Sequence, residues 1–174
     1  MSVTPRGLPR FTAADADRAY DEWGCNCGPA ALAAIAGVDL ERARDAIPGF
    51  VERGYTSPAM MRAALASLSG WPGWAPLNWP RYGLVRIQWE GPWTEPGVPM
   101  VARYRHTHWV GAQQIGDPPA VGVFDVNAIG NGTGWVSLDD WTGEIAPFLA
   151  AHIRRANGRW HITHAIEWPT EPPQ

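Results

Sequence analysis

Six side chains in this 174-residue sequence have the types and the spacing to do chemistry together. They are Cys25 and Cys27 in "GCNCGPAALAAI", His106 and His108 in "RYRHTHWVGA", and Asp125 and Asn127 in "VGVFDVNA". A thiolate nucleophile needs an imidazole as its ion-pair partner and a third group that orients the imidazole. The order cysteine, histidine, aspartate therefore predicts a thiolate site.

Cys27 is the better candidate for the nucleophile. Small and apolar residues from Pro29 to Ile35 predict a short buried helix whose N-terminus lies at the cysteines. A thiolate there is stabilised by the helix dipole and by unpaired backbone N–H groups, whereas Cys25 precedes the helix. We expect Gly28 to leave space for a substrate. The alternative is that Cys27 is a small, inert, buried residue under the helix, which would need neither a histidine nor an aspartate partner.

The histidines and the acidic segment fall in predicted strands. His106 and His108 alternate with neighbours, so both are expected on one face of a strand, and Asp125 and Asn127 on one face of the next. Adjacent strands would bring a histidine beside the carboxylate. We favour Asp125 over Asn127 as the orienting group, because a carboxylate stabilises imidazolium better than an amide does.

A metal site is the alternative for the same residues. Cys25, Cys27, His106 and His108 offer the sulfur and nitrogen ligands that Zn²⁺ binds. Structural zinc sites, however, usually separate paired cysteines by two to four residues, and only one residue lies between these. We therefore expect no metal and no cofactor.

The predicted elements place helices before strands, which indicates an α+β fold. Capping signals and turn residues delimit them. The predicted helices cover 13–23, 29–35, 40–47, 58–68 and a segment from Ser137 toward His152, and the predicted strands cover 83–89, 98–104, 108–115, 120–126 and 158–168. We expect one domain over 1–174, with an N-terminal arm at 1–11 and a tail at 169–174.

Taken together, these segments resemble the papain-like cysteine peptidases. The most similar branch contains the bacteriocin-processing peptidases that cut after double-glycine leaders, in which a Cys-Gly-Pro-Ala-Ala-Leu-like stretch opens the first core helix. The resemblance covers roughly residues 20–140 and implies a nucleophile helix packed on an antiparallel sheet. Position by position, it makes Cys27 the nucleophile, His108 the base and Asp125 the orienting residue of a hydrolase acting on a peptide or amide bond.

Two positions depart from that family pattern. Asn26 stands where the family usually has an acidic residue, and Asp21 stands where a glutamine helps to form the oxyanion hole. The second departure leaves open a catalytically silent papain-like module that serves for binding or structure. An acyl transferase using the same thioester chemistry is the third alternative. Domains of this kind also occur in phage genomes, so a virion-associated role fits as well.

The composition and charge of the chain limit the classes of partner that it can bind. All 14 basic residues are scattered arginines and the formal net charge is −3, so a nucleic-acid partner is not expected. No apolar stretch is long enough for a signal peptide or a membrane span, which predicts a cytoplasmic protein. The segment 70–93 is rich in tryptophan and proline. It is interpreted either as a rigid connector that caps the core or as an aromatic surface for a sugar, peptide or protein partner.

Overall fold

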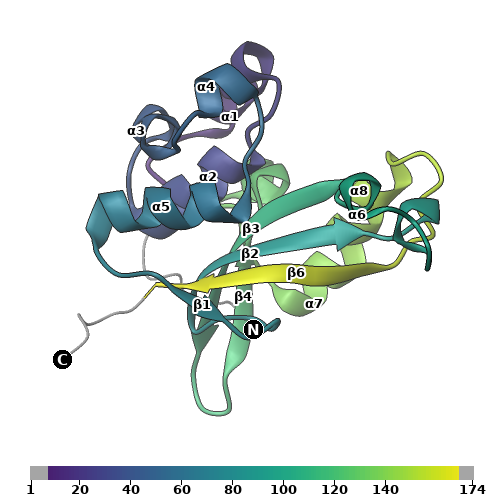
Figure 1. Cartoon of the computed structure of the whole chain (residues 1–174). Coiled ribbons are helices and arrows are strands. Elements are labelled where there is room, and N and C mark those ends of the chain that lie inside the picture. Colours follow the sequence, from purple (N-terminus) through teal and green to yellow (C-terminus); the bar gives the residue numbers. More distant parts are fainter. Residues whose placement is uncertain (1–7, 169–174) are drawn as a thin grey trace.

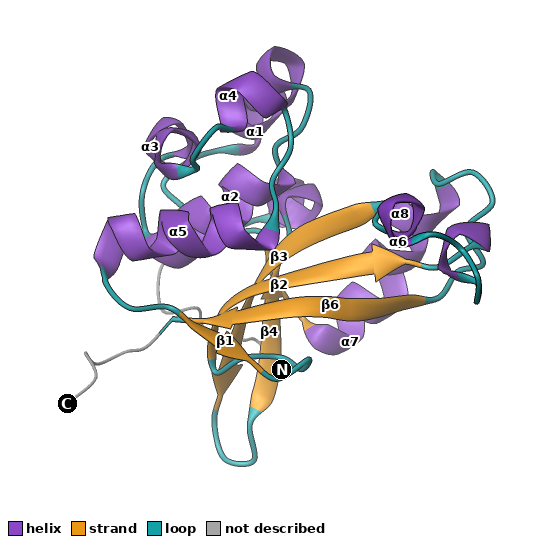
Figure 2. Ribbon diagram, viewed as in Figure 1, coloured by secondary structure: helices purple, strands orange, loops and turns teal. Residues whose placement is uncertain are grey.

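A computed structural model describes residues 8–168 and shows a mixed α+β architecture built on one sheet (Figure 1). Figure 2 shows the N-terminal helices grouped on one side of the strands. The core has two parts, one on each face of the sheet. One part joins the N-terminal helices to Leu84, Trp109 and Phe124, and the other joins the last helices to Val85 and Val110.

The elements follow one another as helices, then strands interrupted by short helical turns, then a last strand. Their bounds are α1 Ala13–Trp23, α2 Cys27–Ala36, α3 Leu40–Ala46, α4 Phe50–Arg53, α5 Pro58–Ser69, β1 Gly73–Ala75, β2 Tyr82–Trp89, η1 Pro92–Thr94, α6 Met100–Arg103, β3 Thr107–Ile115, β4 Ala120–Phe124, η2 Val126–Asn131, β5 Trp135–Ser137, α7 Leu138–Asp140, η3 Trp141–Ile145, α8 Ala146–Ala151 and β6 Trp160–Glu167.

Six strands of the described chain form an antiparallel sheet in the order β1-β6-β2-β3-β4-β5. The central strand β2 is flanked by β3 and by the C-terminal strand β6. Its residues are buried from Gly83 to Trp89, because helices cover both faces of the sheet. The predicted α+β fold with an antiparallel sheet is confirmed.

Local signals explain where the N-terminal helices begin. The Thr12 side chain accepts a hydrogen bond from the Asp15 backbone while Asp15 reaches back to Thr12, as the sequence predicts for α1. Ser57 caps α5, which has Pro58 in its first turn. Between them lies α2, in which every residue from Gly28 to Ile35 is buried.

Gly111 allows α2 to lie close to the sheet. A Cβ atom at this position would come within 3.1 Å of Ile35 Cδ1 in α2 and of Phe124 Cβ in β4. Such contacts are tighter than ordinary van der Waals packing. The absence of a side chain in β3 thus sets how closely the helix that carries Cys27 approaches the strand that carries His108.

Two predicted elements differ from the structure. Residues 98–104 are not a strand: α6 occupies Met100–Arg103, and exposed Met100 and Val101 have no sheet to pack against. The helix expected from Ser137 toward His152 is divided into α7, η3 and α8. The backbone N–H of Ala146 bonds to Trp141 O, five residues back, just before Pro147, which has no N–H to continue the ladder.

The aromatic-rich segment 70–93 is divided between the surface and the core. Trp79 packs edge-on against Trp141 and Trp160, and Trp89 is buried. In contrast, Trp71 is 71% exposed and Trp74 is 50% exposed. The second part of the segment therefore caps the core, as the connector interpretation expects, while its first part lies at the surface.

The expected chain ends fall largely outside the described residues. The arm at 1–11 is described only from residue 8, and its last residue, Phe11, is buried and packs edge-on against Phe124. The tail at 169–174 lies wholly outside. Within residues 8–168, the helices are all too short or too polar to cross a bilayer.

Candidate active site

Three elements bring Cys27, His108 and Asp125 together. Cys27 is the first residue of α2, and His108 is the second residue of β3. Asp125 directly follows β4 and caps the turn η2. Since β4 pairs with β3 and α2 packs on β3, the three side chains meet at one end of the sheet. The expectation that adjacent strands set a histidine beside a carboxylate is met by this arrangement.

Asp125 is completely buried, and both of its oxygens are hydrogen-bonded. Oδ2 accepts from His108 Nε2 at 2.9 Å and from Trp141 Nε1 at 2.9 Å. Oδ1 accepts from the backbone N–H and the side-chain amide of Asn127, each at 2.9 Å. Four donors compensate the loss of water, so the carboxylate can stay ionised in the interior.

The charges of His108 and Asp125 stabilise each other. Burial alone would lower the pKa of His108, but the charge and hydrogen bond of Asp125, together with Cys27, raise it to about 10. Burial likewise works against ionisation of Asp125, yet His108, Trp141 and Asn127 hold the pKa of Asp125 at about 2. The pair is therefore an imidazolium and a carboxylate at neutral pH.

Cys27 is half-buried and interacts with the other side of the imidazole. Burial raises its pKa, but the hydrogen bond and charge of His108 and the backbone N–H of Trp109 outweigh this, so the pKa of the thiol is lowered overall. Asp125 holds Nε2 of His108, which leaves Nδ1 as the ring nitrogen available to the sulfur. The geometry favours a thiolate–imidazolium pair.

The helix start adds donors beside the sulfur. The first intrahelical bond runs from the N–H of Ala30 to Asn26 O, and Pro29 has no N–H. The N–H groups of Cys27 and Gly28 therefore lie outside the helical ladder, at the positive end of the dipole. Gly28 was expected to leave space for a substrate. A Cβ atom there would lie 2.7 Å from the Thr56 side chain, so Thr56 occupies the space beside Gly28.

Cys25 has a different environment. Its sulfur donates to the carbonyl oxygen of Gly54 over 3.4 Å. Burial, and to a lesser degree the charge of Cys27, raises the pKa of Cys25 to about 11. Both cysteines are free thiols, and only Cys27 has a partner that stabilises its anion.

His106 and Asn127 are not placed as expected. His106 precedes β3, is exposed, has a φ of 53° and stacks on Trp93 with the ring centroids 4.5 Å apart. It therefore shares no strand face with His108. Asn127 lies in η2 rather than in a strand, and it bonds to Asp125 instead of a histidine. The expected alternation fails because β3 starts at Thr107 and β4 ends at Phe124.

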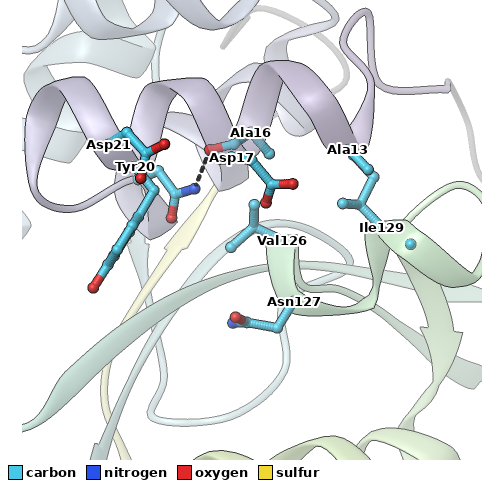
Figure 3. Close-up of a pocket in the computed structure, with 10 residues that line it drawn as sticks. Ala13, Ala16, Asp17, Tyr20, Asp21, Val126, Asn127 and Ile129 are labelled. Carbon is cyan, nitrogen blue, oxygen red and sulfur yellow. Dashed lines mark hydrogen bonds between the residues drawn. The ribbon is translucent and has the colours of Figure 1, made fainter.

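A cavity of about 670 Å³ lies between α1 and η2 (Figure 3). It is joined to the triad through Asn127, which lines the cavity and bonds to Asp125. Asp21, Tyr20 and Asp17 face it from α1, and Asn127 and Val126 face it from η2. Asn26 also lines the cavity, and its Nδ2 donates to Ala16 O over 2.8 Å. Asp21 is exposed at this wall, so its carboxyl group lines the cavity.

Sequence reasoning missed two residues of the site. Trp141, sixteen positions further along the chain, donates to Asp125. It lies in a π-helical turn, which no local sequence signal predicts. Arg86 lies in β2, two strands from Asp125, and is buried near Cys27. A run such as "GLVRIQW" gives no sign that its one charged residue points inward.

Within residues 8–168, no three histidine, cysteine or acidic side chains are arranged to hold a metal ion. His106, one of the four ligands considered for zinc, lies outside the group formed by Cys27 and His108.

No protein-family model matches this chain, and neither the curated proteins nor the solved structures include one that is significantly similar to it.

Proposed function

We propose that the protein is a papain-like thiol hydrolase that cleaves a peptide or amide bond through Cys27, His108 and Asp125. The observation that carries this proposal is the buried 2.9 Å contact between His108 and Asp125, with Cys27 on the other side of the ring at the start of α2. A charged imidazole held between a carboxylate and a thiol is what thiol catalysis requires.

In the proposed reaction, the Cys27 thiolate attacks the carbonyl carbon and forms a tetrahedral intermediate. The imidazolium of His108 then gives its proton to the leaving amine, the C–N bond breaks, and a thioester remains. Water attacks the thioester while neutral His108 accepts a proton from it. The acid product leaves, and the thiolate–imidazolium pair is restored. Asp125 keeps the imidazole oriented and stabilises its charge in both halves.

The backbone can supply part of the oxyanion stabilisation. The N–H groups of Cys27 and Gly28 lie at the positive end of a ten-residue helix and outside its hydrogen-bond ladder. A donor of this kind is worth about 10²–10³ in rate when it is aimed at the developing negative charge. A second donor from α1, where the resemblance expects a glutamine, is replaced by the Asp21 carboxylate.

The test is the rate at which each cysteine is alkylated by iodoacetamide at pH 6–7, measured by peptide mass spectrometry. Cys27 should react much faster than Cys25, because the pKa of Cys27 is lowered while that of Cys25 is about 11. His108→Ala should remove this reactivity, and His106→Ala, its control from the same His-x-His motif, should retain it. Equal rates for the two cysteines, or loss of reactivity in His106→Ala alone, would contradict the proposed roles.

A further inference from the structure

Arg86 is a buried cation without an acidic partner. The residue is 8% exposed, and among the ion pairs of residues 8–168 none involves this guanidinium. Nη2 donates to Thr107 Oγ1 over 3.2 Å, and the group lies 5.7 Å from the ring centroid of Tyr104. The Nε–H has no acceptor. Burying such a charge is costly, so a compensating anion is expected.

Two further nitrogen atoms without partners flank Arg86. In the strand register Arg86 stands opposite Trp109 in β3 and opposite His164 in β6. Trp109 Nε1 and His164 Nδ1 are both buried and both lack a hydrogen-bond partner in the structure. Opposed residues in antiparallel strands point to the same face. Three neighbouring strands thus carry a row of unsatisfied nitrogen atoms on the face that packs against α2, and buried groups of this kind are rare without a ligand or water.

This row lies beside the nucleophile. Trp109 follows His108 in β3, and its backbone N–H reaches the sulfur of Cys27. The hydrogen bond to Thr107 directs the guanidinium of Arg86 toward the end of β3 where His108 lies. The negative charge of Cys27 in turn acts on Arg86.

A cavity adjoins the row at His164. It measures about 280 Å³, and Tyr104 and His164 are part of its wall. Arg103 and His161 also line it, and no acidic residue does. The cavity is therefore large enough for a side chain or a chain end, and the positive charge of Arg103 in its lining is complementary to an anion.

We propose that Arg86, with Trp109 and His164, binds a carboxylate of the substrate next to the bond that Cys27 attacks. This inference rests on the proposed thiol hydrolase and adds a substrate class: peptides or amides that carry an acidic side chain or a free C-terminal carboxylate near the scissile carbonyl. The guanidinium supplies charge and a directed donor, as arginine does in other carboxylate sites. Trp109 and His164 add donors without adding a fixed charge.

Binding is tested in the Cys27→Ala protein with three probe peptides, acetyl-Ala-Glu-Ala-amide, acetyl-Ala-Gln-Ala-amide and acetyl-Ala-Gln-Ala with a free C-terminus. We expect one of the two carboxylate peptides to bind on the order of tenfold more tightly than the uncharged one by calorimetry. The peptide that binds more tightly shows whether the carboxylate comes from an acidic side chain or from a free C-terminus. Adding Arg86→Gln should abolish the preference, and adding Arg105→Gln, which removes an exposed arginine, should leave it. Equal affinities for all three peptides would overturn the proposal.

Alkylation of Cys27, in protein that retains this cysteine, distinguishes a failure of this proposal from a failure of the proposed function. We expect the ratio of the iodoacetate rate to the iodoacetamide rate to fall several-fold in Arg86→Gln and to stay unchanged in Arg105→Gln. A ratio unchanged in Arg86→Gln, with both rates lowered equally, would show that Arg86 only stabilises the thiolate, and would overturn the carboxylate site. If Cys27 is inert to both reagents while the peptides still depend on Arg86, then the hydrolase fails and the anion site stands.

Discussion

Asp125 contributes most to the charge of His108, because it contacts the ring and raises the pKa of His108 more than Cys27 does. Asp125→Asn keeps the size of the side chain and removes its charge. The pKa of His108 should then fall from about 10, so the imidazolium needed to protonate the leaving amine is lost at lower pH. We expect a loss of about 10²-fold or more in turnover at neutral pH.

The measurement for this substitution is the pH dependence of turnover. The alkaline limb of the profile should move to lower pH in Asp125→Asn, and the exposed Asp139→Asn should leave it in place. An unchanged alkaline limb, with the protein folded, would remove Asp125 from the role of orienting and charging His108.

Asp21 raises a separate question about the oxyanion. A carboxylate at a position that should donate to the developing negative charge would repel it, so Asp21→Gln is expected to raise the turnover of any amide that the wild type cleaves. The gain can approach the 10²–10³ that one such donor is worth, if the amide reaches the oxyanion. Asp17→Asn, on the same helix and the same cavity wall, is the matched control. A lower turnover in Asp21→Gln would show that Asp21 has a different role.

The types and order of the triad residues can be read from the sequence, but their surroundings cannot. Cys27 could be identified because a Gly-Pro pair and a helix follow it. His108 could be preferred over His106 only through the resemblance, because the strand start at Thr107 depends on pairing with Gln88. Trp141 and Arg86 reach the site through long-range packing, for which one sequence carries no local signal.

At the scale of elements, the contact between α2 and β3 sets the distance from sulfur to imidazole. Gly111→Ala adds a methyl group that must displace Ile35 or Phe124. We expect a loss of about 1–3 kcal/mol in the free energy of unfolding, together with slower alkylation of Cys27, because the helix moves away from His108.

Chemical denaturation and the iodoacetamide rate measure both effects of Gly111→Ala. Gly73→Ala, in β1, is the control, since a Cβ atom there would meet open space. If Gly111→Ala destabilises the protein and leaves the reactivity of Cys27 unchanged, then the spacing between α2 and β3 does not control the ion pair.

The elements that could be predicted are those with strong local signals. α1, α3 and α5 have side-chain caps, and β2, β3, β4 and β6 have apolar or alternating runs between turn residues. The three-residue strands β1 and β5 exist because a longer partner offers its edge, so their own sequences indicate little. The false strand at 98–104 has apolar residues but no partner edge to pair with.

For the molecule as a whole, the site links stability to pH in two opposing ways. The pKa of His108 is raised from 6.5 to about 10, so its stabilising contribution is complete below pH 6.5 and lost as the pH rises to 10. The pKa of Cys27 is lowered from 9.0, so its contribution is complete above pH 9 and lost as the pH falls through the lowered pKa. Where the pH lies above both 6.5 and the lowered pKa of Cys27, and below 9, folding moves a proton from sulfur to imidazole, and the pH dependences of the two contributions cancel.

In that pH range we therefore expect this site to add little pH dependence to the melting temperature of the wild type. Cys27→Ser has a hydroxyl that does not ionise, so only the His108 contribution remains, and its melting temperature should fall as the pH rises. Cys25→Ser is the control, because Cys25 is neutral throughout this range with a pKa of about 11. Thermal unfolding at several pH values measures the difference, and parallel curves for wild type and Cys27→Ser would contradict the ion pair.

The two shortest strands lie at the two edges of the sheet. β1 and β5 contain three residues each, whereas β2 and β3 in the interior contain eight and nine. An edge strand presents unpaired N–H and C=O groups that can recruit a strand from another molecule, and a short edge presents few of them. β1 pairs with β6 only at Ala165–Glu167, so the rest of β6, Trp160–His164, is the part of this edge where strand addition from another molecule should begin when the protein is concentrated.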